Sequence, residues 1–181
     1  MEISEKHFVT GNNIRPPHPD GFLELRVGMG CFWGPEKIFW ELEGVHATSV
    51  GYSGGIKDEP TYREVCSGTT GHAEVILIVY QPELISTGEI LKVFWEGHDP
   101  TQFMRQGNDV GSQYRSVVFY SDQSMLELIE KTKAQYQLSL SNAGYGDIVA
   151  EVHQTQTFHY AEDYHQQYLA KNPDGYCGHG G

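Results

Sequence analysis

Residues 73–80 read Ala-Glu-Val-Ile-Leu-Ile-Val-Tyr and give the strongest strand pattern in the chain. A short, continuous apolar run of this kind indicates a strand that is covered on both faces of its sheet. Glu74 is the one acidic residue within it. Other parts of the chain must therefore cover both sides of the sheet at this strand.

Outward from this strand, apolar residues recur with the period of strands or of helices. Further strands are expected at residues 21–27, 46–52, 115–120 and 147–153, and helices at about residues 35–43, 86–97, 124–140 and 161–171. Two pairs, Ser86 with Glu89 and Ser124 with Glu127, have the capping-box spacing of a helix start. The order β-α-β-β-α-β, then α-β-α, predicts an α+β fold. Its mixed sheet has a split β-α-β, ferredoxin-like core with helices packed on the sheet.

Two long segments, residues 53–72 and 98–114, show no clear period and are expected to be loops, which are often functional in compact domains. The chain has no internal repeat and no linker-like boundary. We therefore predict one catalytic domain over residues 21–171. Residues 1–20 form an N-terminal arm that is poorly ordered or lies along the surface, and residues 172–181 form a flexible, glycine-rich tail.

The composition limits the class of protein. The chain has 181 residues, of which 39% are hydrophobic, enough for one domain with a sizeable core. Its 12 basic and 24 acidic residues give a formal net charge of −12. Such a surface repels phosphate, so nucleic acids and anionic membranes are poor partners. No apolar run is long enough for a membrane span, and the first residues lack the features of a targeting peptide.

Three cysteines, Cys31, Cys66 and Cys177, are too few and too widely spaced for a disulfide framework. Reduced thiols are typical of the cytoplasm, which is the expected location, with an organelle as the alternative. Cys177 lies in the glycine-rich tail. A mobile thiol near a chain end suits a resolving cysteine, which forms a disulfide with an oxidised partner.

Cys31 lies between a predicted strand and a predicted helix, in Gly30-Cys-Phe-Trp-Gly34. The unpaired N–H groups and the partial positive charge of a first helical turn favour a thiolate. Cys31 is therefore a candidate nucleophile. The alternative is a cysteine that only packs in the turn. The adjacent Phe32 and Trp33 form either the floor of a pocket or part of the core.

Glu74 is a candidate general acid. Burial in an apolar strand raises the pKa of a carboxyl group and keeps it protonated near neutral pH, as proton donation requires. The alternative is a carboxylate at the strand end that points to water.

The histidines suggest two other kinds of site. His72 or His98, the latter followed by Asp99, is compatible with a Cys-His-Asp acyl-transfer site. A metal site would draw on His153, His159 and His165. Neither pattern is specific, because the chain has no Cys-x-x-Cys and no His-Glu-x-x-His.

The segment around Cys31 resembles the signature of the peptide methionine sulfoxide reductase A family. Further segments resemble that family in the same order: Val50–Gly55, Thr61–Cys66, Gly71–Glu74, His98–Gln102, Gly107–Ser116, Ala161–Gln167 and Asn172–Gly178. The resemblance covers roughly residues 22–178, which is nearly the whole chain.

The resemblance implies a peptide-methionine (S)-S-oxide reductase, an oxidoreductase that repairs methionine S-sulfoxide in proteins and as the free amino acid. Cys31 matches the nucleophile, which becomes a sulfenic acid, and Glu74 matches the proton donor. Tyr62 and Tyr114 match two phenols that bind the sulfoxide oxygen.

The family's remaining site positions also have matches here. Asp109 matches an acidic residue that orders the loop before Tyr114. Phe32 and Trp33 match the aromatic wall around the methyl group of the substrate.

The resemblance also implies a recycling step. Cys177 matches the resolving cysteine, and thioredoxin or another dithiol reduces the resulting disulfide, with no bound cofactor and no metal. The chain has no second recycling cysteine after Gly178, so a two-cysteine cycle and a longer natural chain both stay open. Cys66 matches a position with no assigned role. The expected partners are oxidised proteins, free methionine sulfoxide and thioredoxin, and the expected state is a monomer.

Two other functions compete with the reductase. One is a Cys-His acyl transferase or hydrolase that uses Cys31 with His72 or His98, which leaves Glu74 and Cys177 unexplained. The other is a metal-binding module without catalysis. A reductase consumes two thiols per sulfoxide and a hydrolase consumes none, so thiol titration during turnover separates them.

Overall fold

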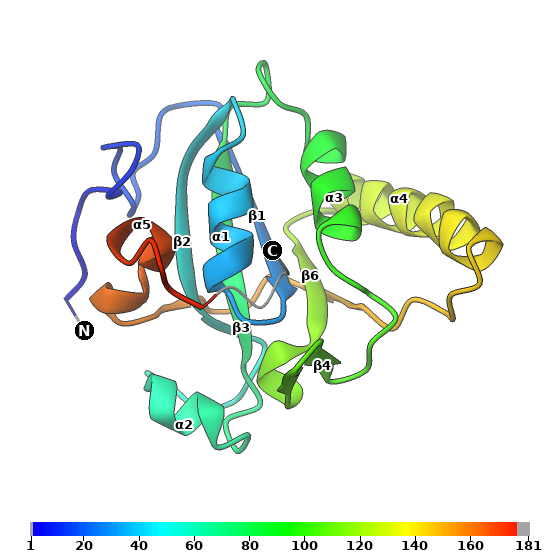
Figure 1. The fold of residues 1–181 in the computed structure, drawn as a ribbon. Coiled ribbons are helices and arrows are strands. Elements are labelled where there is room, and N and C mark those ends of the chain that lie inside the picture. The colour runs from blue at the N-terminus through cyan, green and yellow to red at the C-terminus, as the bar shows by residue number, and fades with distance from the viewer. Residues whose placement is uncertain (1, 177–181) are drawn as a thin grey trace.

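A computed structural model describes residues 2–176 of the chain. Six strands form one sheet in the order β7-β6-β1-β3-β2-β8 (Figure 1). Their bounds are β1 Leu23–Met29, β2 Val45–Ser53, β3 Ala73–Tyr80, β6 Ser116–Tyr120, β7 Glu151–Gln154 and β8 His159–Tyr160. Strands β6 and β7 are parallel, and the other neighbouring pairs are antiparallel.

The centre of the sheet is a split β-α-β unit. Strand β3 lies between β1 and β2 and is antiparallel to both, so β1 and β2 are parallel to each other. Helix α1 (Trp33–Trp40) connects them. Strand β6 beside β1 completes the four-stranded core. The predicted α+β class, with a mixed sheet and a ferredoxin-like core, is confirmed.

Helices cover one face of the sheet. Helices α1 and α3 (Thr87–Glu96) lie on it, and α4 (Gln123–Asn142) packs against α3 (Figure 1). All eight residues of β3 are buried, as its apolar run predicts. Ile76 and Ile78 join the core beneath the helices. Because side chains alternate along a strand, Glu74 also points to this face, toward α1.

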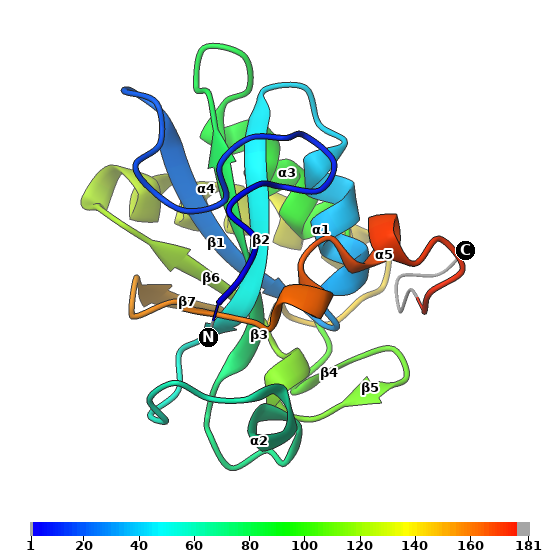
Figure 2. The same cartoon turned by 90° about the vertical axis from the view of Figure 1, so that its left-hand side faces the viewer.

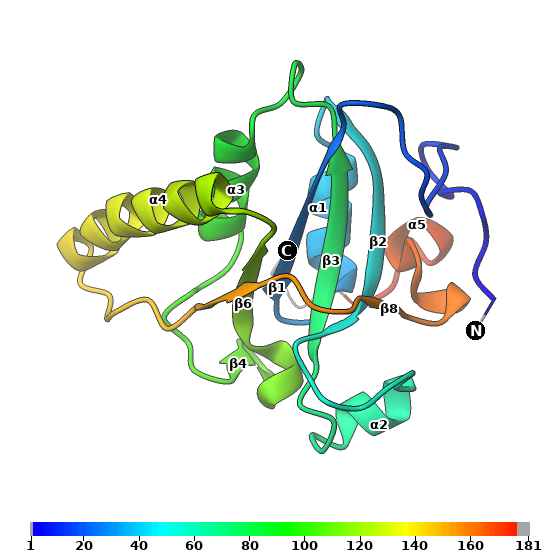
Figure 3. The same cartoon turned by 180° about the vertical axis from the view of Figure 1, so that it is seen from behind.

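The opposite face of the sheet is covered without helices. After α4 the chain crosses behind the sheet as an extended segment that carries β7 and β8 (Figure 3). Phe158 of this segment packs on a second cluster that consists of Ala73, Val75, Val117 and Phe119. Both faces of β3 are therefore covered.

The two predicted loops contain short elements. Helix α2 (Tyr62–Cys66) lies within residues 53–72. Strands β4 (Arg105–Gln106) and β5 (Asp109–Val110) form a hairpin within residues 98–114, followed by a single-turn 3₁₀ helix, η1 (Ser112–Tyr114). Figure 2 shows α2 and the hairpin at the same end of the molecule. Both loops thus contribute residues to one end of the sheet.

The predicted helix starts are partly correct. Ser86 and Glu89 form the predicted capping box of α3. The predicted box at Ser124 is wrong, because Asp122 caps α4 by accepting a hydrogen bond from the Met125 N–H at 2.9 Å. Asp122 already has the extended backbone of a cap residue, so the helix begins before Ser124.

The predicted continuous helix over residues 161–171 is also wrong. The structure has a 3₁₀ turn, η2 (Asp163–His165), and a short helix, α5 (Tyr168–Lys171). Gln167 separates them with a φ of +48°. Its backbone N–H and its side-chain amide both donate to the carboxylate of the buried Glu36 in α1, each at 2.8 Å. These two hydrogen bonds to α1 stabilise the non-helical backbone at Gln167 more than the local sequence pattern favours a continuous helix.

The N-terminal arm lies along the surface of the domain, one of the two predicted forms. Ile3 and Ile14 are buried, and Lys6 and Asn13 form an isolated bridge. His7 is buried and bonds through Nε2 to the Thr48 hydroxyl at 2.9 Å. The predicted tail lies largely outside the described residues. Within residues 2–176, no helix is long and apolar enough to cross a membrane.

Candidate active site

Cys31 lies in the short connection between β1 and α1. Gly30 before it has a φ of +90°, a left-handed conformation that glycine adopts without strain. The Cys31 residue is 8% exposed. Phe32 is the N-cap residue of α1 and offers no side-chain cap to the helix. The thiol is therefore buried at the entry to a helix.

Glu74 reaches the same turn from β3. Its Oε2 accepts a hydrogen bond from the Phe32 N–H at 3.0 Å, and the residue is 1% exposed. Burial raises the pKa of Glu74 to about 8, the Phe32 N–H opposes this rise, and the charge of Asp109 adds to it. The alternative of a carboxylate that points to water is wrong. A protonated acid stands beside the Cys31 turn at neutral pH.

Two phenols come to this acid from the short elements. Tyr62 is the first residue of α2 and Tyr114 the last residue of η1. Burial is the largest cause that raises the pKa of each phenol, and the charge of Glu74 raises both further. The charges of Cys31 and Asp109 also act on Tyr114. Both phenols stay protonated and can donate hydrogen bonds without carrying charge.

Asp109, on β5, connects the cluster of Glu74 and the two phenols to Tyr176, the last described residue. The Tyr176 hydroxyl donates to its carboxylate, at 3.3 Å to Oδ2 and 3.4 Å to Oδ1. Tyr176 is the residue before Cys177, which itself lies outside the described residues.

Phe32 and Trp33 belong to an aromatic cluster with the C-terminal segment. The Trp33 ring stacks on Tyr168 with centroids 3.9 Å apart, and its Nε1 donates to His165 Nδ1 at 3.0 Å. The His165 ring lies 5.3 Å from Phe32 and 4.5 Å from Tyr62. Phe32 is buried in the core and Trp33 is half-buried, so Trp33 forms the open part of this wall.

His165 is neutral at this position. Burial lowers its pKa to about 4. Because Nδ1 accepts the indole N–H of Trp33, the proton of the neutral ring is on Nε2. The ring thus holds Trp33 in place without adding charge beside Phe32 and Tyr62.

The two histidines of the alternative acyl-transfer site, His72 and His98, have structural partners. His72 accepts the Gly55 N–H at Nδ1 and bonds through Nε2 to the Lys57 carbonyl. His98 bonds to the Phe94 carbonyl and to the Ser116 hydroxyl. Among residues 2–176, no three His, Cys, Asp or Glu side chains are grouped so that they would hold a metal ion.

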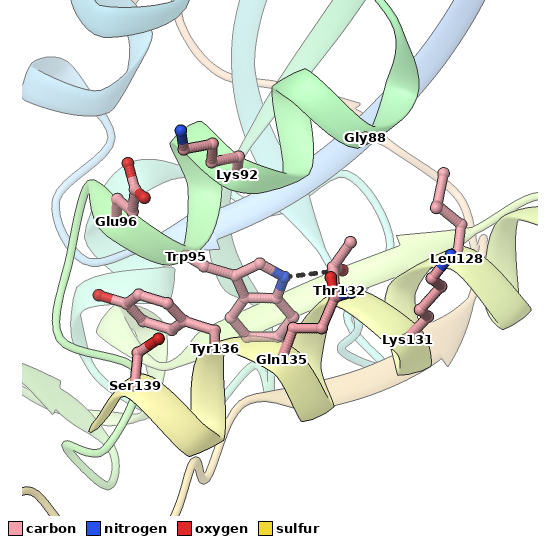
Figure 4. Close-up of a pocket in the computed structure, with 10 residues that line it drawn as sticks. All are labelled: Gly88, Lys92, Trp95, Glu96, Leu128, Lys131, Thr132, Gln135, Tyr136 and Ser139. Atoms are coloured by element: carbon pink, nitrogen blue, oxygen red, sulfur yellow. Dashed lines mark hydrogen bonds between the residues drawn. The ribbon is translucent and has the colours of Figure 1, made fainter. Parts of the chain in front are cut away.

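A separate groove lies between α3 and α4 (Figure 4). Its volume is about 430 Å³. Trp95 and Tyr136 form part of its wall, and the Trp95 indole N–H donates to the Thr132 hydroxyl at 3.0 Å. None of the predicted site residues lines it. The groove is therefore distinct from the site around Cys31.

Comparison with known proteins places the chain in a family. A model of the family described as peptide methionine sulfoxide reductase matches residues 24–180. The chain belongs to this family. The reductase MsrA of Rippkaea orientalis is 55% identical over the whole chain, which covers 83% of that relative. The mitochondrial reductase of Rattus norvegicus is 56% identical, and the chain covers 78% of it.

Solved reductase structures have the same fold. Methionine sulfoxide reductase A of Corynebacterium diphtheriae gives a TM-score of 0.85 at 42% identity, over 96% of this chain and 84% of that one. Mxr1 of Saccharomyces cerevisiae in complex with Trx2 gives a TM-score of 0.59 at 24% identity, over 83% of this chain and 87% of that one. The predicted family and enzyme class are confirmed.

The structure of this reductase adds three residues to those matched by the family resemblance: Glu162 and Tyr168, which no sequence pattern indicated, and His165, which the sequence suggested only as a metal ligand. Glu162, His165 and Tyr168 all contact the predicted site residues Trp33 or Tyr62. They follow one another in the segment Ala161–Gln167 and just beyond it, which the family resemblance includes. One sequence feature could have indicated these residues. It is the cluster of acidic, aromatic and histidine side chains in a segment whose pattern otherwise predicts an ordinary helix.

Proposed function

We propose that this chain reduces methionine S-sulfoxide, in proteins and as the free amino acid, with Cys31 as nucleophile and Glu74 as proton donor. One observation carries the assignment of roles: the Glu74 carboxyl is buried, protonated at neutral pH and bonded to the turn that carries Cys31. A buried acid in this state supplies the proton that a sulfoxide oxygen requires.

In the first half of the cycle, the Cys31 sulfur attacks the sulfur of the substrate. Glu74 gives its proton to the sulfoxide oxygen as charge develops there. The bond between the substrate sulfur and this oxygen then breaks, and the oxygen passes as a hydroxyl group to the Cys31 sulfur while the S–S bond made by the attack breaks. Methionine leaves as the thioether, Cys31 becomes a sulfenic acid, and the proton of the Cys31 thiol returns to Glu74. One sulfur is reduced by two electrons and the other is oxidised by two.

The two phenols stabilise the oxygen during this step. Tyr62 and Tyr114 donate hydrogen bonds to an atom that gains negative charge, which is electrostatic catalysis of the oxyanion type. Asp109 holds the segment before Tyr114 and receives the Tyr176 hydroxyl. Its role is to order this side of the site.

The handedness of the substrate follows from two fixed positions. The oxygen lies at the phenols and Glu74, and the methyl group lies against Phe32 and Trp33. Because Trp33 is held by His165 and Tyr168, the methyl position is rigid. With the attacking sulfur also fixed, only one epimer places all groups correctly, and membership of the family implies that it is the S epimer.

In the second half of the cycle, the Cys177 thiol attacks the sulfenic acid, which releases water and forms a Cys31–Cys177 disulfide. The bond from Tyr176 to Asp109 supports a tail that reaches the site. An external dithiol then reduces the disulfide. Thioredoxin is the proposed dithiol, supported by the yeast Mxr1 complex with Trx2.

The same proposal includes a monomeric enzyme in a reducing compartment, the cytoplasm. The net charge of −12 disfavours nucleic acids and anionic membranes as partners, and three widely spaced cysteines suit a reduced environment.

Two cysteine variants test the assignment of roles. Cys31→Ser should lose sulfoxide reduction, because a hydroxyl is a far weaker nucleophile than a thiolate. Cys177→Ser should release one equivalent of methionine per enzyme and then stop when thioredoxin is the only reductant, since thioredoxin attacks a disulfide. Methionine release is followed over time with the sulfoxide and thioredoxin in excess over the enzyme, with Cys66→Ser as the matched control.

Steady turnover by Cys31→Ser would overturn its assignment as nucleophile. Full multiple turnover of Cys177→Ser with thioredoxin would show that Cys66 resolves the sulfenic acid instead. The competing hydrolase is tested in the same samples, because it would leave the number of free thiols unchanged.

A further inference from the structure

We propose that Glu162 is a positioning residue that holds Tyr62 at the sulfoxide-oxygen site by joining helix α2 to the sheet. This inference rests on the proposed function of Tyr62. Glu162 follows β8 by two positions, so it comes from the extended segment and not from the loop that carries Tyr62. It is half-buried.

Glu162 makes one bond to each of two elements. Its Oε2 accepts the backbone N–H of Tyr62, the first residue of α2, at 3.0 Å. Its Oε1 accepts the hydroxyl of Tyr52 at 3.0 Å. Tyr52 is fully buried on β2 and lies directly opposite Glu74 in the strand register. The Glu162 carboxylate therefore connects the start of α2 to Tyr52, the β2 residue that is paired with Glu74.

Helix α2 depends on such a connection because its own contacts are few. It has five residues, of which only Val65 is buried. Its capping box satisfies the N–H groups of Thr61 and Glu64, and these bonds lie within the loop and at the surface. They shape the first turn but do not fix it to the sheet. The capping box does not use the Tyr62 N–H, which donates to Glu162 instead. Because Glu162 also accepts a hydrogen bond from Tyr52, it holds the first turn of α2 at a fixed distance from β2.

The charge of Glu162 gives this connection additional strength. A carboxylate that accepts from a backbone N–H and from a phenol makes charge-assisted bonds, which are stronger than neutral ones. Both bonds require that the side chain be long enough to span from Tyr52 to Tyr62.

The next residue, Asp163, provides a matched control. It is also an acid in the same turn, but its Oδ1 accepts the Ser4 N–H at 2.7 Å and its Oδ2 lies 3.6 Å from the Lys171 ammonium. Asp163 thus connects the N-terminal arm and α5, with no bond to α2. Replacement of Asp163 removes a local carboxylate without changing the support of Tyr62.

The test is a double-mutant cycle between Glu162→Ala and Tyr62→Phe. Methionine formation is measured in single turnover with a peptide that contains methionine S-sulfoxide, so that recycling by Cys177 does not enter. Glu162→Ala should lower the rate about tenfold with a smaller change in substrate affinity, because Tyr62 binds the oxygen most strongly in the transition state. In the Tyr62→Phe background, the same change should lower the rate less than twofold.

Conservative variants complete the design. Glu162→Gln can accept the Tyr62 N–H at its carbonyl and donate its amide to the Tyr52 oxygen, so it should keep at least half of the rate. Glu162→Asp keeps the charge but is one methylene shorter, and should show most of the loss. It replaces the alanine variant if the latter does not fold, as judged by thermal unfolding. Asp163→Ala should react like the parent protein.

The outcomes separate the inference from the proposed function. If the parent protein and Asp163→Ala form no methionine from the sulfoxide, the proposed function fails. If they react normally but Glu162→Ala is equally fast, the positioning role fails. It also fails if the loss is equally large with Phe at position 62, because Glu162 would then act on something other than Tyr62.

Discussion

At the scale of the single residue, Glu74 is subject to two opposed effects. Burial favours the neutral carboxyl group, whereas the Phe32 N–H favours the carboxylate. Burial is the larger effect, so the pKa rises to about 8. The group is therefore mostly protonated at pH 7 and is ready to give up its proton near the operating pH.

Glu74→Gln should lower the rate of sulfoxide reduction by roughly 10² or more, because an amide keeps a hydrogen bond to the oxygen but cannot deliver a proton. The parent rate should fall as the pH rises above about 8, since the acid is then ionised. The variant should lack this alkaline limb. Single-turnover rates from pH 6 to pH 10 measure both effects.

The exposed Glu43→Gln is the control for a change of charge alone. If the rate of Glu74→Gln still fell above the same pH as the rate of the parent protein, the group that titrates there would not be Glu74. An unchanged rate would make Glu74 a structural residue.

Sequence reasoning found the residues whose local pattern is unusual. Cys31 stands between a strand and a helix, and Glu74 interrupts an apolar run. Glu162 and His165 lie in a segment whose pattern predicts an ordinary helix. Their importance comes from contacts with Tyr62 and Trp33, about 100 and 132 positions away in the chain, and no local pattern reports such contacts.

At the scale of the element, two helices begin with the same capping box but differ in what surrounds them. In α3, four residues are buried in the core, whereas α2 buries only Val65. The loss of one cap therefore affects the whole domain in the first case and mainly the local turn in the second.

Ser86→Ala should lower the free energy of unfolding by about 1 kcal/mol and leave the catalytic rate unchanged. Thr61→Ala should change the free energy of unfolding less but lower the rate several-fold, because it loosens the turn that begins at Tyr62. Urea unfolding and single-turnover rates on both variants test this contrast. Equal effects of the two changes on the rate would contradict it.

Element prediction succeeded where a run was long enough to show a period. The strand over residues 73–80 and the helix that begins at Ser86 were found because several turns or alternations repeat. Strands β4 and β5 have two residues each and η1 has three, too short for any periodicity to appear. The sequence pattern therefore predicts a loop for the elements that carry Asp109 and Tyr114.

At the scale of the whole molecule, buried ionisable groups set the pH dependence of stability. Burial raises the pKa of Glu36 to about 7 and of Glu74 to about 8, from 4.5. Between pH 4.5 and these raised pKa values, the two carboxyl groups bind more protons in the folded state than in the unfolded state. Their contribution to stability therefore falls as the pH rises. Burial lowers the pKa of His7 and His165 from 6.5 to about 4, which makes stability rise with pH over that range. Above pH 6.5 only the carboxyl effect is left.

Because the two carboxyl groups and the two histidines have opposite effects between about pH 4.5 and 6.5, we expect the free energy of unfolding to change little over that range and to fall by a few kcal/mol from pH 6.5 toward pH 8.5. Glu36→Gln should reduce the slope of this fall, whatever its effect on stability at pH 6.5. Denaturant unfolding at half-unit intervals of pH gives the slope. Glu41→Gln, at an exposed position that follows α1, is the control. The same slope in the Glu36 and Glu41 variants would contradict the assignment.

The extended segment behind the sheet has a consequence for biosynthesis. A ribosome makes Cys31 well before Glu162, His165 and Tyr168. A growing chain thus carries its reactive thiol before the groups that orient Tyr62 and Trp33 exist. A polypeptide that stops before residue 161 retains the strands of the central core but has no completed reaction centre. We therefore expect such a fragment to reduce sulfoxide more slowly than the parent protein, because Tyr62 and Trp33 are held in place only after the segment with Glu162, His165 and Tyr168 has docked.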